Sequence, residues 1–297
     1  MVTSDVVKET LNVAGLSTNV YTQANLRDKR TSEPVVVLFF LHGRTESADH
    51  IDPIARAAFS WAAEKGASSR EALRDFIVVT FDQRNHGKRM VDQRGNLGWS
   101  KNADQHNERQ AVDMYSTSIG ALKDVSFLID VLQSYVFPHD ERTIGEWVLA
   151  GFSLGGHATW LALRHEPRIR IGIPICGCAD IFALLERGAD RLGVPRTAPY
   201  FPESLRALVR AYNPTAAPPG AFVGKRILVL SGADDTVAPW SASRAFVEAL
   251  DVGERGRKEI MVLPGKHGCT DEMRDEMFRF FWEEALVTRQ ENRKCAL

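Results

Sequence analysis

Unbroken apolar runs of strand length are the feature that most constrains the fold of this chain. The run from Pro34 to Leu41, PVVVLFFL, is rich in β-branched and aromatic residues and has no polar interruption. Such a run is typical of a strand buried on both faces of a parallel sheet. The same pattern recurs at Phe76–Phe81, Trp147–Ala150, Ile169–Ile175, Ile227–Leu230 and Ile260–Leu263.

Stretches with helical periodicity separate these runs. Strands that alternate with helices predict an α/β fold, with a mostly parallel central sheet and helices on both faces. The start of the chain differs, because VVKETLNVAG and LSTNVYT alternate in polarity around Gly15 and predict an N-terminal antiparallel hairpin at the sheet edge. The predicted helices are Ile54–Glu64, Glu108–Tyr135, His157–Arg164, Ser241–Leu250 and Asp271–Leu286.

One segment interrupts the alternation. No strand-like run occurs between Gly177 and Gly224, and six of the 13 prolines fall between Pro195 and Pro219. An excursion of this length inside a compact domain is usually functional or disordered, and we expect a small cap over the carboxyl edge of the sheet. The predicted division is a core of residues 1–176 and 224–289, a cap insertion of residues 177–223, and a tail of residues 290–297.

Charge and composition narrow the class of function. The 297 residues include 37 Lys and Arg against 38 Asp and Glu, so no basic surplus is present for nucleic acid or an anionic membrane. No run approaches the roughly 18 consecutive apolar residues of a membrane span. The first residues lack the basic and apolar regions of a secretory signal. We expect a cytoplasmic protein that binds neither nucleic acid nor membranes.

The four cysteines, at positions 176, 178, 269 and 295, do not form a disulfide framework in a chain of this length. Cys176 and Cys178 are too close for the usual CxxC zinc pair, and no second pair accompanies them. We expect reduced thiols and no metal. The last three residues, Cys295-Ala296-Leu297, have some similarity to a peroxisomal tripeptide but lack its basic middle residue. A frayed tail is the favoured interpretation, and the signal remains the alternative.

Ser153 is the candidate nucleophile. It stands in GFSLGG, between the run at Trp147–Ala150 and a helical stretch. Glycines two residues to either side avoid clashes where a chain turns sharply from strand into helix. Such a turn exposes the hydroxyl beyond the sheet edge and directs the amide of Leu154 toward an oxyanion. Because G-x-S-x-G also arises by chance, the assignment depends on this placement.

A serine nucleophile needs a base, and His267 is the candidate. It lies in LPGKHGC, directly after the run at Ile260–Leu263, so its loop reaches the same edge of a parallel sheet. His165 also follows Ser153, but it lies three helical turns away, at roughly 18 Å. The base in turn needs a carboxylate that fixes its tautomer and stabilises the imidazolium.

Two aspartates follow the run at Ile227–Leu230, in the sequence SGADDTVAP. Its G-x-x-D-x-x-x-P spacing resembles a pattern common at this point of serine hydrolases and favours Asp235, with Asp234 as the alternative. After the first buried run, His42-Gly43-Arg44 resembles the oxyanion loop of lipases and esterases. That resemblance implies the Arg44 backbone amide as the second oxyanion donor. The Arg44 side chain either turns outward or meets an anionic part of the substrate.

Together these motifs resemble the α/β-hydrolase-fold serine hydrolases, in the neighbourhood of the esterases and dienelactone hydrolases. The resemblance spans about residues 34–289 and includes FDQRNHGKR, which is similar to a D-x-R-x-H-G loop of many members. In that family this loop is chiefly structural. A dienelactone hydrolase proper would carry a cysteine in place of Ser153. The implied structural residues are Asp82, Arg84 and His86, with His42 as a hydrogen-bonding group inside its own loop.

The resemblance implies cleavage of a carboxylic ester, or a related acyl bond, of a small to medium-sized molecule through an acyl-enzyme on Ser153, without a cofactor. Thioesterases, lactone hydrolases and C–C bond hydrolases use the same constellation, and some members of the fold are ligand receptors or catalyse non-hydrolytic reactions. The sequence leaves these alternatives open. It also leaves open whether the polar segment Met90–Gln110 walls the site or faces solvent, and whether the aromatic cluster Phe278–Trp282 packs on the sheet or serves a homodimer.

Overall fold

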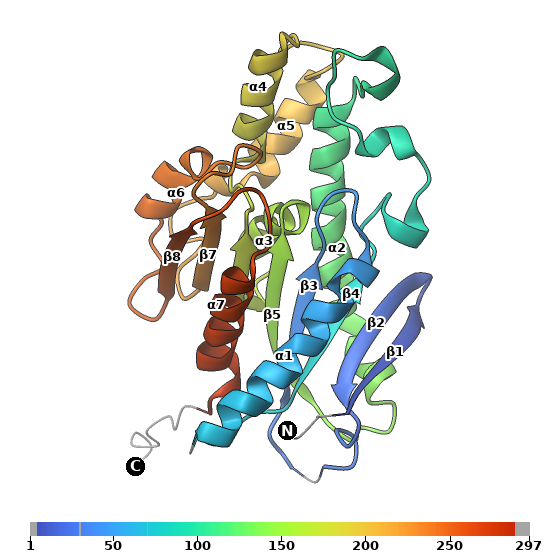
Figure 1. Ribbon diagram of the computed structural model, residues 1–297, viewed down its shortest axis with the longest axis vertical. Helices are drawn as coiled ribbons and strands as arrows, with labels where there is room; N and C mark the ends of the chain where they lie inside the picture. The colour runs from blue at the N-terminus through green and yellow to red at the C-terminus, as the bar shows by residue number, and fades with distance from the viewer. Residues whose placement is uncertain (1–4, 30, 70, 289–297) are drawn as a thin grey trace.

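A computed structural model of the protein describes residues 5–29, 31–69 and 71–288. The predicted tail at 290–297, with Cys295-Ala296-Leu297, lies outside these residues. Within them the chain forms an eight-stranded sheet in the order β1-β2-β4-β3-β5-β6-β7-β8 (Figure 1). β1 pairs antiparallel with β2, and β2 pairs antiparallel with β4. All other neighbouring strands are parallel.

Each buried run of the sequence is a strand, so the predicted fold class is confirmed. β4 and β6 coincide with their apolar runs and β3 begins one residue later, whereas β5, β7 and β8 extend a few residues beyond theirs, because residues outside an apolar run still pair with the neighbouring strand. Their bounds are β3 (Val35–Leu41), β4 (Phe76–Phe81), β5 (Ile144–Phe152), β6 (Ile169–Ile175), β7 (Arg226–Gly232) and β8 (Arg257–Leu263).

The N-terminal hairpin is also as predicted. β1 (Val6–Val13) and β2 (Leu16–Gln23) are joined by a two-residue turn. Both turn residues, Ala14 and Gly15, have positive φ angles of 48° and 88°. A turn of this kind matches the twist of the two strands, and the side chain of Asn12 accepts the Gly15 N–H at 2.8 Å.

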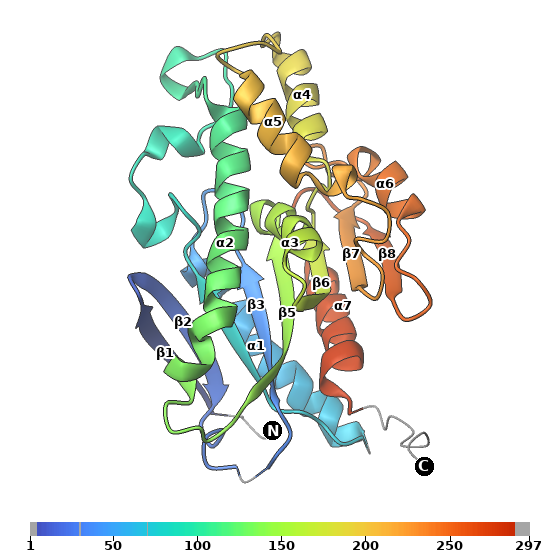
Figure 2. The ribbon, with the colours of Figure 1, turned by 180° about the vertical axis from the view of Figure 1, so that it is seen from behind.

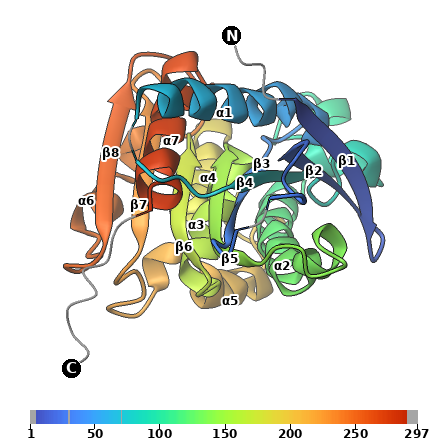
Figure 3. The same ribbon diagram turned by 90° about the horizontal axis from the view of Figure 1, so that it is seen from below.

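Helices cover both faces of the sheet. Seen from below, α1 (Ala48–Ser68) and α7 (Asp271–Phe281) lie along one face, and α2 (Gln110–Val136) and α3 (Leu154–His165) lie along the other (Figure 3). β3 shows why its sequence has no polar residue. Val36, Leu38 and Phe40 belong to the core under α1 and α7, whereas Val37 and Phe39 belong to the core under α2 and α3.

All five predicted helices differ from the observed ones at one or both ends, α2 and α3 by one to three residues at each end. α1 begins at Ala48, continues through Pro53 and ends at Ser68, whereas the sequence predicts a helix from Ile54 to Glu64. The last predicted helix, Asp271–Leu286, is α-helical to Phe281 and ends in a π-helical turn from Trp282 to Leu286. The predicted stretch Ser241–Leu250 is a 3-10 turn, η5 (Trp240–Ala242), followed by α6 (Arg244–Ala249).

The segment between β6 and β7 contains α4 (Ile181–Leu192), α5 (Glu203–Tyr212) and the turn η4 (Pro214–Ala216). α4 and α5 lie over the carboxyl ends of the parallel strands, beside the upper end of α2 (Figures 1 and 2). The division into a core and a cap insertion at 177–223 stays a prediction. Among the described residues, no helix combines the length and the apolar character that crossing a bilayer requires.

Candidate active site

A strained turn carries Ser153. β5 ends at Phe152, α3 begins at Leu154, and Ser153 between them has φ 52° and ψ −108°. Its N–H donates to the carbonyl of Ile175 at 2.8 Å. The flanking glycines are required sterically. A Cβ atom at Gly151 would lie 2.3 Å from the Gly155 carbonyl oxygen, and one at Gly155 would lie 2.4 Å from the Leu41 carbonyl oxygen.

The ring of His267 joins the hydroxyl of Ser153 to a carboxylate. Its Nε2 atom lies 2.8 Å from Ser153 Oγ, and its Nδ1 atom lies 2.7 Å from Asp235 Oδ2. The three residues follow β5, β7 and β8, whose carboxyl ends meet at one edge of the sheet. Phe152 packs against the ring, with centroids 5.2 Å apart. The structure therefore brings together three side chains that are far apart in the chain.

Of the two candidate aspartates, Asp235 is the one that contacts His267. Its second oxygen, Oδ1, accepts the backbone N–H groups of Val237 and Ala238, both at 2.8 Å, and the residue is only 4% exposed. Asp234 is exposed, and its backbone N–H donates to the Gly265 carbonyl. The tight turn thus holds one carboxylate against the imidazole and leaves the other in solvent.

The loop after β3 presents a free backbone donor near Ser153. Among the described residues, the amides of Arg44 and Leu154 have no acceptor. The amide of Gly43, in contrast, donates to Glu46 Oε2 at 2.8 Å. An oxyanion formed at Ser153 could therefore be bound by Arg44 and Leu154 but not by Gly43 without breaking an existing bond.

His42 holds this loop from inside. Its Nδ1 donates to the Gly43 carbonyl at 2.7 Å, and its Nε2 accepts the N–H of Gln83 at 3.0 Å. Both bonds suit a neutral ring, and burial lowers the pKa of His42 to about 4. His42 is therefore a structural group in its loop, as expected from the sequence.

The loop after β4 has the structural role that the sequence implies. Asp82 accepts the N–H of Ala48 at the start of α1 and the N–H of Lys88, both at 2.8 Å. Arg84 pairs with Asp124 of α2 at 2.9 Å, and Nδ1 of His86 donates to the carbonyl of Arg84. The side chains of this loop connect the sheet edge to α1 and α2.

A cavity of about 280 Å³ opens beside Ser153. Several of its lining residues are absent from the sequence prediction because they come from the helices above the sheet and from the loop after β7. They are Gln110 and Met114 of α2, Leu184, Leu185, Gly188 and Arg191 of α4, and Thr236, Val237 and Ala238 of the loop. His157 also lines the cavity, and its spacing of four residues from Ser153 on one helix was a usable sequence signal.

Trp99 and Gln110 of the segment Met90–Gln110 form part of one wall of this cavity, whereas Val91 and residues 101–105 of the same segment are exposed to solvent. Trp99 lines the cavity, is 6% exposed and packs against Phe201 with ring centroids 5.5 Å apart. The side-chain oxygen of Gln110 accepts the backbone N–H of Trp99. The segment contains the 3-10 turns η2 (Gln93–Asn96) and η3 (Ala103–Gln105), and η1 (Gly87–Arg89) directly precedes it.

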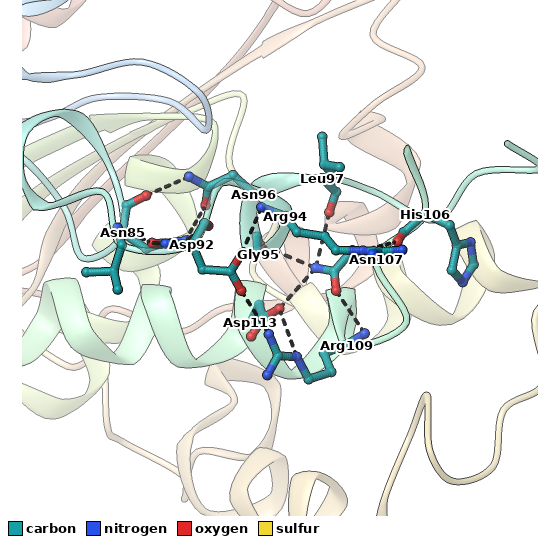
Figure 4. Close-up of polar contacts among 11 residues, drawn as sticks. Asn85, Asp92, Arg94, Gly95, Asn96, Leu97, His106, Asn107, Arg109 and Asp113 are labelled. Carbon is teal, nitrogen blue, oxygen red and sulfur yellow. Dashed lines mark hydrogen bonds and ion pairs between the residues drawn. The ribbon is translucent and has the colours of Figure 1, made fainter. Parts of the chain in front are cut away.

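Hydrogen bonds and an ion pair fix the conformation of the segment Met90–Gln110 and connect it to its neighbours. The side chain of Asn107 donates to Asp113 of α2 at 3.0 Å, and the side chain of Asn96 donates to the carbonyl of Asn85 at 2.6 Å (Figure 4). Arg109 pairs with Asp92 at 3.0 Å. The wall is thus connected to α2 and to the loop after β4.

A sequence model of the alpha/beta hydrolase family matches residues 38–287, which is most of the chain. The chain belongs to the alpha/beta hydrolase family. Its described architecture, with the parallel sheet and the turn that carries Ser153, is that of an alpha/beta hydrolase. A comparison with curated proteins gave no match.

Solved structures share the fold of this alpha/beta hydrolase at low sequence identity. TT1662 from Thermus thermophilus is 22% identical, with 94% of this chain and 99% of that chain covered and a TM-score of 0.65. Acetyl xylan esterase 1 from Thermoanaerobacterium sp. JW/SL YS485 is 15% identical, with 94% and 88% covered and a TM-score of 0.56. The esterase Pf2001 from Pyrococcus furiosus is 16% identical, with 96% and 90% covered and a TM-score of 0.52.

One group of the described residues has three metal-ligating atoms close together. In this alpha/beta hydrolase the Cys176 thiol and the side chains of Asp235 and His267 lie within 4.8 Å of one another. Burial raises the pKa of the Cys176 thiol to about 11, so the thiolate that a metal prefers is disfavoured. The Nδ1 atom of His267 also faces Asp235 at 2.7 Å. These residues fit a hydrogen-bonded pair better than a metal site.

Proposed function

We propose that this protein is a serine hydrolase that cleaves a carboxylic ester, or a related acyl bond, of a small molecule through an acyl-enzyme on Ser153. The supporting observation is the position of the His267 ring, 2.8 Å from Ser153 Oγ and 2.7 Å from Asp235 Oδ2. A hydroxyl is a weak nucleophile unless a positioned base removes its proton, and the base works best when a carboxylate orients it.

The proposed reaction has two halves. As Ser153 Oγ forms a bond to the substrate carbonyl carbon, His267 Nε2 takes the hydroxyl proton. The tetrahedral intermediate collapses when its bond to the leaving oxygen breaks, and His267 returns the proton to that oxygen. A water molecule then attacks the acyl-enzyme with His267 as base, and the acid leaves as Ser153 regains its proton. In both halves the Asp235 carboxylate orients His267 and stabilises the imidazolium.

The negative charge of each intermediate falls on the former carbonyl oxygen. In the proposal the free amides of Arg44 and Leu154 bind this oxygen, and the amino end of α3 adds a favourable dipole. Donors of this kind contribute most when they are fixed before the reaction. The His42 bonds to Gly43 and Gln83 fix the loop that carries the Arg44 amide.

The cavity limits the size of the substrate. At about 280 Å³ it is slightly smaller than the roughly 300–1,000 Å³ of drug-sized sites. Two solved structures of the same fold are named esterases, which favours an ester among the acyl bonds this geometry could cleave. Thioesters, lactones and C–C bonds next to a carbonyl are the alternatives that a substrate panel separates.

The test is covalent labelling of Ser153 by a fluorophosphonate probe, together with hydrolysis of 4-nitrophenyl esters of short acids. We expect labelling and turnover in the wild type, and loss of labelling with at least about 10³-fold lower turnover in Ser153→Ala. Ser116→Ala, an exposed serine of α2, is the matched control and should behave as wild type. Near-normal ester turnover by a folded Ser153→Ala protein would overturn the assignment of the nucleophile.

A further inference from the structure

The charged side chains that line the cavity beside Ser153 are all positive in the part of the chain that the structure describes. Of the described residues that line it, two are arginines, Arg44 and Arg191, and none is an aspartate or glutamate. Among the described residues, neither guanidinium has an ion pair or a hydrogen bond. Unpaired arginines are ordinary on a surface, but Arg44 is partly buried, and removal from water costs free energy that a paired anion would offset.

Arg44 is partly buried, and in the described part of the chain no carboxylate pairs with its guanidinium to offset the cost of burial. Desolvation alone lowers the pKa of its guanidinium, and no acidic group among the described residues opposes this effect. The nearest acid in the sequence, Glu46, uses Oε2 to accept the Gly43 N–H. The charge of Arg44 is therefore free to bind a ligand.

A second observation concerns the neutral groups of the cavity, which are also donors. Trp99 is 6% exposed, and its buried indole N–H has no acceptor among the described residues. Gln110 uses its side-chain oxygen to accept the Trp99 backbone N–H, which leaves its NH₂ group as a donor. The indole nitrogen has almost no accessible surface, so of these two donors it is the Gln110 NH₂ group that can bind an acceptor in a ligand.

His157 adds a donor to the same set. Its Nδ1 accepts the backbone N–H of Cys178 at 2.8 Å, and burial lowers its pKa to about 4, so the ring is neutral at neutral pH. A neutral imidazole that accepts through Nδ1 carries its proton on Nε2. The cavity is thus lined by two arginines, Arg44 and Arg191, together with an amide NH₂ and an imidazole N–H.

We propose that the substrate of this site carries a carboxylate, which binds the Arg44 guanidinium in the cavity a few bonds from the carbonyl that Ser153 attacks. This proposal rests on the proposed hydrolase function and deepens it. A carboxylate accepts hydrogen bonds only, and its two oxygens match the planar fork of an arginine. The carboxylate and the attacked carbonyl must lie close together, because both bind the same residue. The carbonyl oxygen binds the backbone amide of Arg44, and the carboxylate binds its guanidinium.

The rest of the lining suits the carbon skeleton between the two groups. Met114, Leu184, Leu185 and Val237 are apolar and face the same cavity. Together with the volume of about 280 Å³, they favour a short, apolar chain that ends in a carboxylate. Half-esters of small dicarboxylic acids have this form.

The first experiment compares two pairs of esters that differ only in a terminal methyl or carboxylate. For the acid side the pair is 4-nitrophenyl pentanoate and mono-4-nitrophenyl glutarate. For the alcohol side it is 4-propylphenyl acetate and 3-(4-acetoxyphenyl)propanoate. We expect kcat/KM at least about tenfold higher for the carboxylate member of one pair, since a charge-assisted hydrogen bond has this strength. No preference for the carboxylate member in either pair would overturn the proposal.

Three variants assign the preference to Arg44. Arg44→Gln should reduce the ratio of kcat/KM within the responsive pair to about threefold or less, and Arg44→Lys should retain part of it, because a lysine keeps the charge without the fork. Arg244→Gln is the matched control, since Arg244 pairs with Glu248 on the exposed surface of α6. An unchanged ratio in Arg44→Gln would overturn the role of Arg44.

A binding experiment separates this proposal from the proposed function. Titration calorimetry with Ser153→Ala compares monomethyl glutarate with methyl pentanoate, so no hydrolysis is needed. We expect saturable binding of the carboxylate ligand, weakened at least about tenfold when Arg44→Gln is added. Hydrolysis of neutral esters without any such binding would contradict the carboxylate site alone. Binding without hydrolysis in the wild type would contradict the hydrolase alone.

Discussion

Asp235 Oδ2 lies 2.7 Å from His267 Nδ1, while its other oxygen accepts two backbone N–H groups of the same turn. All three of these hydrogen bonds therefore join the carboxylate to donors of the ring and the backbone. The ring of His267 is oriented by a group that is itself fixed by the backbone.

Asp235→Asn should lower kcat by about 10³-fold or more, because an amide can present its NH₂ group to Nδ1 and stabilise the wrong tautomer of the imidazole. Steady-state hydrolysis of a 4-nitrophenyl ester measures this effect. Asp234→Asn is a close control, since Asp234 is the exposed neighbour in the same turn, and we expect its kcat within about twofold of the wild type. Equal losses in the two variants would show that the turn and not the carboxylate is responsible.

The backbone of Ser153 predicts an effect on stability. At φ 52° and ψ −108° a residue with a Cβ atom is strained by about 1–3 kcal/mol, whereas glycine is not. Glycine also costs about 0.4–1 kcal/mol through the entropy of the unfolded chain. The strain outweighs the entropy, so Ser153→Gly should unfold at higher urea concentration than Ser153→Ala. A lower midpoint for the glycine variant would contradict the strain, and neither variant should hydrolyse esters.

The sheet was predictable from the sequence because a strand that is buried on both faces has apolar residues at successive positions. Val35–Leu41 has no polar residue, since alternate side chains enter two different cores. The convergence of Ser153, Asp235 and His267 was predictable for a related reason. Parallel strands end at one edge, so loops that follow β5, β7 and β8 are neighbours there wherever they lie in the chain.

The cavity wall was not predictable in the same way. α4 is strongly amphipathic, but its pattern does not tell which turn lies over Ser153, and Leu184 and Arg191 reach the site only through the packing of α4 on α2. Trp99 lies in a polar segment with no periodicity. Its orientation depends on Phe201, which is distant in the chain, and on Gln110, which lies 11 residues further on at the start of α2.

Gly155 should be one of the least tolerant positions of the fold. A Cβ atom there would lie 2.4 Å from the carbonyl oxygen of Leu41, and backbone atoms cannot move aside as a flexible side chain can. We expect Gly155→Ala to lower the free energy of unfolding by about 3 kcal/mol or more, measured by urea denaturation, or to prevent soluble expression.

Gly188 provides the contrast on another helix. An added Cβ atom would meet its nearest neighbour, Cζ3 of Trp99, at an ordinary 3.7 Å. Alanine is favoured over glycine inside a helix by about 1 kcal/mol. Gly188→Ala should therefore be neutral or stabilising, and a loss similar to that of Gly155→Ala would mean that close backbone approach is not the cause.

His42 predicts a pH dependence of stability. Its pKa is about 4 in the folded protein and 6.5 in an unfolded chain, so between these values the unfolded state binds a proton that the folded state does not. Stability from this residue is complete above pH 6.5 and is lost as the pH falls toward 4, by up to about 3 kcal/mol. Urea unfolding of the wild type and of His42→Gln at several pH values measures this loss of stability.

We expect a smaller decrease of the unfolding free energy in His42→Gln over this range, whatever its stability at pH 7. His139→Gln, at an exposed histidine, should keep the wild-type slope. If all three proteins lose stability in parallel, His42 is not buried in its neutral form.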